Sequence, residues 1–307
     1  PAVVSKRALF IVNRHSRAGM SDLSAAQGVL RERGIGIVER SVESAEDVGE
    51  TIRAGCREVD LVILAGGDGT MNAAADALAE CGLPLGILPT GTGNDLARTL
   101  GIPTSLAEAA AVIADGQRHA IDLGRVNGKH FFNVASIGLA AELTRHHTVE
   151  RKRRFWLFAY VLSVSDAFRA TRPFRARLRC DGRERELHVI QISIGNGRHY
   201  GGGMTISEDA AIDDGMLDVY CLKPLSLWRL MTLLPSLRSG RLGRQSGALA
   251  MRGRAIEVST RRPMPINTDG ELTTRTPATF TVVPGAVSIF VPSSHAVGRE
   301  AMADAAQ

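Results

Sequence analysis

The sequence predicts an α/β domain with a doubly wound parallel sheet, followed by a mostly antiparallel β domain that is a sandwich or an irregular barrel. Two observations predict this: strands and helices alternate in the first part of the chain, and strand-like runs dominate the second. With 307 residues, 44% of them hydrophobic and 22% charged, the chain is long enough for two domains of about 150 residues that each bury a core.

The first part alternates short apolar runs with helical segments. The expected strands are Ala8–Val12, Gly36–Arg40, Asp60–Leu64 and Leu85–Leu88. The expected helices are Ser21–Arg33, Ala45–Gly55, Met71–Glu80, Asn94–Leu100 and Ser105–Ala114. The third strand is apolar on both faces, which is typical of a parallel strand that helices cover on both sides. This part is therefore predicted to be a Rossmann-like domain.

The second part is dominated by β patterns. Asn127-Gly128 suits a two-residue turn, so His119–Val126 and Lys129–Ser136 are expected to form a hairpin. The other expected strands are Phe174–Cys180, Arg185–Ile194, Met216–Leu222, Ala255–Ser259, Pro265–Thr268, Ala278–Val283 and Val287–Val291. Two helices, Phe155–Arg169 and Leu225–Leu237, are expected to interrupt them, and a polar, alanine-rich tail follows from Ser293.

Composition excludes several classes of protein. The longest nearly apolar stretch, Phe155–Val164, is half of the ~20 residues that a membrane-spanning helix needs. We expect no signal peptide, because no charged segment precedes an apolar run at the N-terminus. The four cysteines lie far apart with no CxxC pair, which argues against a zinc cluster and for reduced cytoplasmic thiols.

Charge is distributed unevenly along the chain. Residues 1–127 hold 12 Lys/Arg and 16 Asp/Glu, net −4, whereas residues 128–307 hold 25 and 16, net +9. The second part is therefore expected to face nucleic acid, phospholipid headgroups or a phosphorylated ligand. Aromatic residues make up only 5% of the chain and no base-stacking module is present, so we expect no nucleic-acid partner.

Basic residues next to interfacial aromatics favour docking on an anionic membrane. Arg151–Arg154 lead directly into Phe155–Phe158, and further arginines follow at positions 169, 172, 175, 177 and 179. A solvated helix end and a charged edge strand would produce the same pattern, so both interpretations stay open.

Two glycine-rich loops, Ala65–Thr70 and Pro89–Asp95, each follow a predicted strand and precede a predicted helix. Glycine lets backbone N–H groups approach a phosphate, and the helix N-terminus adds a positive dipole end. Because the carboxyl ends of neighbouring parallel strands share one edge, the two loops are expected to line one crevice. The alternatives are a tight turn without ligand for the first loop and a simple helix cap for Asn94 or Asp95.

Three further segments are candidates for the same chemistry. Asn13–Gly19 is a basic loop after the first strand, or a solvated turn. Gly201–Met204 with the acidic turn Ala211–Asp218 can hold a cation, or is only a glycine loop and a turn. Asn267–Glu271 can be a hairpin turn without any function. Beside a nucleotide, its two carboxylates could accept a proton or bind Mg²⁺.

Other phosphate-binding and catalytic motifs are absent. The sequence has no GxxxxGK[ST] loop, and Leu96 replaces the third glycine of a dinucleotide fingerprint. The protein-kinase set, HExxH, EF-hand and GxSxG motifs are also absent.

In order and spacing, the motifs Gly-Gly-Asp-Gly-Thr, Pro-x-Gly-Thr-x-Asn-Asp-Leu-Ala-Arg, Gly-Gly-Gly-Met…Asp-Asp-Gly-x-Leu-Asp and Asp-Gly-Glu resemble those of the diacylglycerol kinase catalytic-domain superfamily, over residues 7–291. The resemblance is closest to bacterial soluble lipid kinases related to diacylglycerol, sphingosine and ceramide kinases. It implies an α/β nucleotide domain over 1–120, to which strands in 284–307 return, and a β-rich lipid-binding domain over 121–283.

The resemblance also implies roles for individual residues. Asp269 would be the general base with Glu271 beside it, and a structural Mg²⁺ would bind the Asp214 carboxylate and the carbonyls of Ala211 and Met216. Asp68 would orient Mg²⁺ or its waters, and Asp95 would lie in a charged network near the structural metal. The implied ATP-binding residues are Asn13, Arg14, His15, Ser16, Arg17, Ser41, Gly66, Gly67, Asp68, Gly69, Thr70, Met71, Asn72, Thr92, Asn94 and Asp95.

The sequence departs from the family pattern at two places. In the first loop this sequence has Arg14 where the family has proline, Arg17 where it has glycine and Ala18 where it has lysine. Arg17 is the candidate for the missing cation, although its planar guanidinium has a different geometry from a lysine ammonium. The proline before the acidic turn is Glu208.

The expected function is transfer of the ATP γ-phosphoryl group to a hydroxyl of a membrane lipid, with diacylglycerol as first candidate. The enzyme would serve phospholipid biosynthesis, be cytoplasmic, and contact the inner face of an anionic membrane. Two alternatives are an NAD kinase-like enzyme and a non-catalytic, nucleotide-sensing membrane-binding protein. The sequence does not identify the lipid or the oligomeric state, for which a homodimer is one option.

Overall fold

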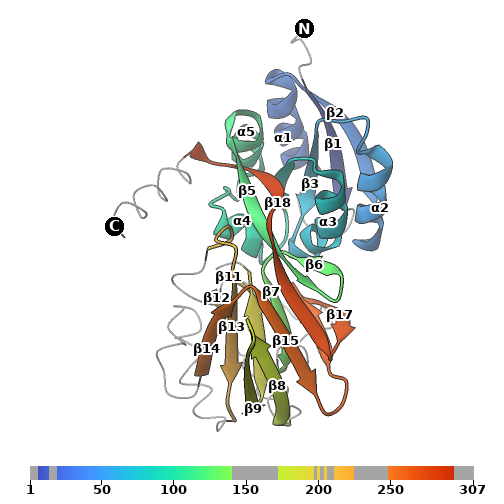
Figure 1. The fold of residues 1–307 in the computed structure, drawn as a ribbon. Coiled ribbons are helices and arrows are strands. Elements are labelled where there is room, and N and C mark those ends of the chain that lie inside the picture. The colour runs from blue at the N-terminus through green and yellow to red at the C-terminus, as the bar shows by residue number, and fades with distance from the viewer. Residues whose placement is uncertain are drawn as a thin grey trace, which may run out of the picture. The chain divides into compact units, whose positions relative to one another are not determined.

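The computed structural model describes residues 6–13, 19–139, 172–196, 199–200, 204–205, 211–224 and 248–293. The chain divides into two compact units (Figure 1). Unit 1 consists of residues 1–123 and 284–307, and unit 2 of residues 124–283. Within the described residues, no helix is both long and apolar enough to cross a membrane.

Unit 1 is the predicted α/β domain. Its elements alternate along the chain as β1 (Lys6–Asn13), α1 (Met20–Glu32), β2 (Ile35–Val42), α2 (Glu46–Gly55), β3 (Leu61–Gly66), α3 (Asp68–Cys81), β4 (Leu85–Pro89), α4 (Asp95–Thr99) and α5 (Leu106–Asp115). The parallel strands lie in the order β2-β1-β3-β4. The last part of β18 (Ala278–Val291) pairs in parallel with β4.

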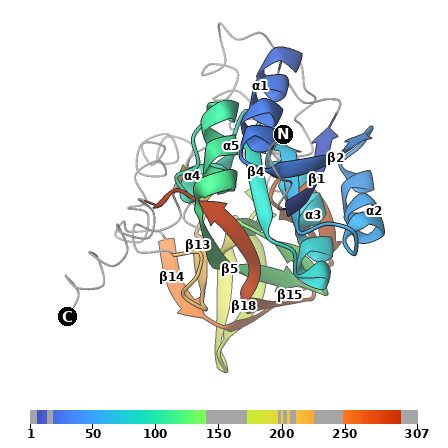
Figure 2. The same ribbon diagram turned by 90° about the horizontal axis from the view of Figure 1, so that it is seen from above.

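Helices cover both faces of this sheet. Helix α1 packs with α5, and α2 packs with α3; Figure 2 shows the two pairs on opposite sides of the strands. All six residues of β3 are buried, as its doubly apolar sequence predicts. The strand order reverses between β1 and β3, and ligands of such sheets bind outside the carboxyl ends of the strands at this switch point.

Helix α3 begins earlier than predicted. It starts at Asp68, three residues before the expected Met71, with Gly67 in an extended conformation as its N-cap. Of the glycine motif, Gly66 therefore ends β3, Gly67 is the N-cap and Gly69 lies in the first helical turn. Glycine lowers helix propensity, which is why composition alone places the start too late.

Unit 2 consists of two antiparallel layers. Its elements are β5 (Gln117–Val126, from unit 1), β6 (Lys129–Phe131), β7 (Val134–Gly138), β8 (Phe174–Cys180), β9 (Arg183–Val189), β10 (Gln191–Gly195), β11 (His199–Tyr200), β12 (Met204–Thr205), β13 (Leu217–Leu222), β14 (Ala248–Gly253), β15 (Ala255–Thr260), β16 (Pro265–Thr268), β17 (Glu271–Arg275) and the first part of β18. One layer has the order β14-β13-β10-β7-β16-β17, and the other contains β18-β15-β8-β9.

The core of unit 2 lies between these layers. Buried side chains of one layer include Ile137 and Val219, and those of the other include Leu178, Val258 and Phe280. Two antiparallel sheets that share one apolar core form a sandwich, so the sandwich interpretation is confirmed over the barrel.

Four predicted strands either divide or merge in the structure. The expected run Arg185–Ile194 breaks at Ile190, because β9 belongs to one layer and β10 to the other. Lys129–Ser136 divides into β6 and β7 for the same reason. Conversely, the two expected strands within 278–291 are one continuous strand, β18.

Other differences are smaller. Strands β14 and β17 were not expected from the sequence. The hairpin at Asn127-Gly128 is present, with both residues at positive φ. The expected helices 155–169 and 225–237 and the tail beyond residue 293 lie outside the described residues.

Candidate active site

The glycine loops that follow β3 and β4 are in backbone contact. Thr90 N–H donates to the Gly66 carbonyl at 3.1 Å, across the parallel pair. A Cβ atom on Gly91 would lie 2.6 Å from the Cα of Gly67, closer than real Cβ contacts. The approach of the two loops therefore requires glycine at position 91.

Asn94 closes the second loop. Its Oδ1 accepts from Gly91 N–H at 3.0 Å, and its Nδ2 donates to the Gly91 carbonyl at 2.8 Å. Asn94 itself has φ +51°, a conformation that asparagine tolerates better than most residues. It occupies the N-cap position of α4, but its side chain serves the loop and not the helix.

Asp68 caps the neighbouring helix. Its Oδ1 accepts from Asp95 N–H at 2.7 Å and from Leu96 N–H at 3.4 Å, which ties the start of α3 to the start of α4. Burial, and then the charge of Asp95, raise the pKa of the Asp68 carboxyl. Asp95 is itself buried and lies 3.4 Å from Arg98 Nη1. The sequence predicted both aspartates as candidate site residues. It did not predict the hydrogen bonds between Asp68 and the start of α4 or the ion pair between Asp95 and Arg98.

The start of α3 suits a phosphate ligand. No side chain caps this helix, since its N-cap is Gly67. The buried hydroxyl of Thr90 has no hydrogen-bond partner within the described residues. Asn13 Nδ2, at the end of β1, lies 3.5 Å from Thr70 Oγ1 in the first turn. A helix N-terminus, a glycine cradle and an orphaned hydroxyl at the switch point fit the phosphates of a nucleotide.

The other predicted nucleotide residues have varied environments. Ser41, on β2, and Thr92 are exposed, Met71 is buried, and Asn72 is half-buried in α3. Arg14, His15, Ser16 and Arg17 lie outside the described residues. The structure therefore brings Asn13 and residues 66–70 together with 90–95, and it does not test the first loop.

Asp269, in unit 2, is fixed by backbone donors. Its carboxylate accepts from Phe132 N–H at 2.7 Å, Asn133 N–H at 3.0 Å and Val134 N–H at 2.9 Å. Asp269 and Gly270 form the β16–β17 turn with φ +48° and +99°, as expected for Asp-Gly in a hairpin. The connection between β6 and β7 thus orients the carboxylate, a long-range contact with no local sequence signal.

Glu271 differs from Asp269 in its environment. It is the first residue of β17 and is exposed, whereas Asp269 is half-buried. The two carboxylates of this Asp-Gly-Glu turn therefore differ: that of Asp269 is fixed by three backbone donors, and Glu271 is exposed.

The Asp214 turn has a cationic partner of its own. The Asp214 carboxylate accepts from Met216 N–H at 2.9 Å and from Ala211 N–H at 3.2 Å, and it pairs with Arg252. Among the described residues, no group of three or more His, Cys, Asp or Glu side chains gathers as a metal site. In this arrangement Arg252 supplies the positive charge that a metal ion would bring, so the donor set alone does not point to a metal.

Two family models match the two parts of the chain. Residues 7–126 match the diacylglycerol kinase catalytic domain, and residues 133–291 match the YegS C-terminal NAD kinase beta sandwich-like domain. A crystal structure of a diacylglycerol kinase from Bacillus anthracis superposes with a TM-score of 0.73 at 24% identity, covering 94% of this chain and 98% of that chain, which supports the fold.

Curated relatives agree over most of their length. A protein of Stenotrophomonas maltophilia named "Probable lipid kinase YegS-like" is 36% identical, covering 90% of this chain and 93% of the relative. The diacylglycerol kinase of Mycobacterium tuberculosis H37Rv is 32% identical, covering 88% and 90%. The chain therefore belongs to the lipid kinase family that joins a diacylglycerol kinase catalytic domain to a YegS-type C-terminal domain.

Proposed function

We propose that this lipid kinase transfers the γ-phosphoryl group of ATP to a hydroxyl of a membrane lipid, with diacylglycerol as the first candidate. The observation that supports the nucleotide half is the Gly67–Gly91 contact, which joins the glycine loops that follow β3 and β4 next to the switch point between β1 and β3. The name of the M. tuberculosis relative supports diacylglycerol as the acceptor.

On the nucleotide side, the backbone would do most of the binding. The N–H groups of the first turn of α3 would hold phosphate oxygens, and Thr90 would complete its hydrogen bonding on the same ligand. Mg²⁺ bound with ATP supplies neutralisation of phosphate charge. Asp68 and Asn94 would keep the loops in register during transfer.

On the acceptor side, we propose Asp269 as the general base, with Glu271 beside it. Three backbone N–H donors fix the orientation of the Asp269 carboxylate, which would accept the proton of the substrate hydroxyl. Such a carboxylate is oriented in advance, which favours proton transfer at a defined position. In a loose phosphoryl-transfer transition state, deprotonation is late and needs no strong base.

A structural Mg²⁺ on Asp214 with the carbonyls of Ala211 and Met216 remains part of the proposal. A metal ion there would have to displace the Arg252 guanidinium from the Asp214 carboxylate. We also propose that the enzyme works at the cytoplasmic face of an anionic membrane, in phospholipid synthesis.

The function is tested with labelled ATP and a panel of lipids in mixed micelles. We expect phosphorylation of diacylglycerol, and we expect Asp269→Asn to abolish transfer while ATP still binds. Glu271→Gln, which changes an exposed carboxylate of the same turn, is the matched control and is expected to retain partial activity. Turnover of Asp269→Asn at the wild-type rate would exclude Asp269 as the base.

A second acceptor is included because the matched C-terminal family is described as NAD kinase beta sandwich-like. NAD is assayed under the same conditions. Phosphorylation of NAD but of no lipid would replace the proposed acceptor, and ATP binding without any transfer would indicate a nucleotide sensor.

A further inference from the structure

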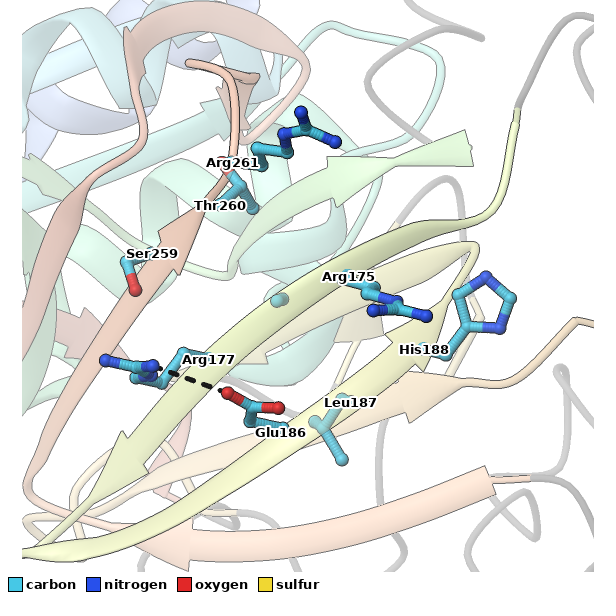
Figure 3. Close-up of a pocket in the computed structure, with 9 residues that line it drawn as sticks. Arg175, Arg177, Glu186, Leu187, His188, Ser259, Thr260 and Arg261 are labelled. Atoms are coloured by element: carbon cyan, nitrogen blue, oxygen red, sulfur yellow. Dashed lines mark hydrogen bonds and ion pairs between the residues drawn. The ribbon is translucent and has the colours of Figure 1, made fainter.

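Unit 2 contains a cationic pocket that the proposed reaction does not use. It has a volume of about 490 Å³ and lies on strands β8, β9 and β15 (Figure 3). Its charged lining residues are Arg175, Arg177, Arg261 and Glu186, so its formal charge is 3 − 1 = +2. The imidazole of His188 also lines it.

Strand register explains why these side chains gather. Arg175 lies opposite His188 across the β8–β9 pair, and Arg177 lies opposite Glu186. Side chains alternate along a strand, so both arginines point outward while the intervening Ala176 is buried in the sandwich core. Figure 3 shows the Arg175 guanidinium beside the His188 ring.

The other end of the same face is neutralised by ion pairs. Arg177 lies 3.2 Å from Glu184 and 3.3 Å from Glu186. Arg179 Nε lies 3.2 Å from a Glu257 oxygen. A second pocket at this end, of about 460 Å³, is lined by two arginines and two glutamates and has a formal charge of zero.

Among the described residues of this face, the arginine and histidine toward the start of β8 lack an acidic partner. Arg175, His188 and Arg261 are exposed, and within the described residues their side chains make no ion pair or hydrogen bond. The turn that carries Arg261 is nevertheless ordered: Thr260 Oγ1 donates to the Arg262 carbonyl at 2.7 Å. The three side chains line one pocket, in which Arg175 and His188 lie side by side and the carboxylate of Glu186 pairs with Arg177.

We propose that Arg175, His188 and Arg261 bind the phosphate of an anionic phospholipid headgroup, so that this face of unit 2 docks on a membrane. A planar guanidinium group can donate two hydrogen bonds to two oxygens of one phosphate. The exposed pocket admits the headgroup of a phospholipid whose acyl chains stay in the bilayer. The choice of a lipid as ligand rests on the proposed function. The set of arginines that the sequence suggested for membrane docking therefore changes. Arg177 and Arg179 form ion pairs within the fold, and Arg261 joins the set from a distant segment.

The test is sedimentation of the full chain with phosphatidylcholine vesicles, with and without phosphatidylglycerol. We expect binding to the anionic vesicles only, weakened about fivefold by Arg175→Gln or Arg261→Gln and about 25-fold by the double variant. Arg185→Gln removes the same charge from the opposite face of β9 and is the matched control. The pair Arg179→Gln/Glu257→Gln removes a neutral ion pair and is expected to have no effect.

Three outcomes would overturn the proposal. Equal loss of binding in Arg185→Gln would mean that only net charge matters. Binding that ignores anionic lipid would exclude headgroup recognition. Inorganic phosphate that shifts the His188 ring signals in NMR spectra, while Arg175→Gln and Arg261→Gln leave vesicle binding intact, would indicate a soluble phosphate ligand.

The docking test is independent of catalysis. If no lipid is phosphorylated but the double variant still loses binding to anionic vesicles, the proposed reaction fails while the headgroup site stands.

Discussion

At the scale of single residues, Asp68 links two helix starts that are 27 positions apart in the chain. Its carboxylate is buried near Asp95, and these two causes, burial first, raise its pKa above the ordinary 3.8. The folded state therefore favours the protonated form. The stability that this preference contributes is complete below pH 3.8 and is lost as the pH rises through the pKa of the folded state.

Two substitutions of Asp68 distinguish the effect of its buried charge from the effect of its hydrogen bonds to the start of α4. Asp68→Asn keeps an oxygen acceptor without the charge, so we expect its free energy of unfolding at neutral pH to equal or exceed that of the wild type, with the difference vanishing toward about pH 4. Asp68→Ala loses the cap and should cost about 1 kcal/mol. Urea unfolding across this pH range measures both, with the exposed Glu58→Gln as charge control. If Asn and Ala destabilise equally at every pH, Asp68 does not act as a cap.

At the scale of elements, the glycine loops after β3 and β4 act as one unit. Their backbones touch at Gly67 and Gly91, and Asn94 holds the second loop in shape. Each loop taken alone has an ordinary strand-to-helix connection. Their contact fixes the two loops relative to each other, so a small change in one loop is expected to alter the conformation of both.

Gly91→Ala tests this contact. The added methyl group would lie 2.6 Å from the Gly67 Cα, and we expect a loss of about 1–3 kcal/mol in stability together with weaker ATP binding. Gly28→Ala, in the middle of α1 with no atom within 4 Å of its added Cβ, is the control and should stabilise the protein by about 0.5–1 kcal/mol. Urea unfolding and ATP titration provide the readouts. Unchanged stability and ATP affinity in Gly91→Ala would show that the loops are free to separate.

At the scale of the whole molecule, two strands pass from one unit to the other. Strand β5 crosses at residues 123–124 and β18 at residues 283–284. Just inside unit 1, the buried Asp122 accepts from Gly285 N–H at 2.8 Å and so joins the two strands. Because each unit takes part of its sheet from these strands, their stabilities are expected to be coupled.

Asp122→Ala removes this acceptor. Loss of a buried partner should cost about 1–3 kcal/mol. We expect amide hydrogen exchange to accelerate in both units, for example in β3 and in β10. Asp122→Asn keeps an acceptor oxygen and is the control. Acceleration confined to unit 1 would show that the units unfold independently.

Much of the fold could be predicted because its signals are local. The alternation of β3 and α3, the Asn127-Gly128 turn and the glycine motifs each lie within a short window. The break at Ile190 could not be predicted, because β9 and β10 belong to different layers although their sequence is one continuous strand-like run. The anchoring of Asp269 by residues 132–134 was equally invisible, since it joins segments about 135 positions apart.

The sequence by itself determined the fold class and the family, and it supplied the candidate site residues, because periodicity and motif spacing are properties of neighbouring residues. Tertiary structure alone decided which of these groups have partners: Asp68 became a cap, Asp214 was neutralised by Arg252, and Arg175 was left without an acid among the described residues. The physical reason is that the interaction energy of a charged group depends on the groups near it in space. Strand pairing brings together residues that lie far apart along the chain.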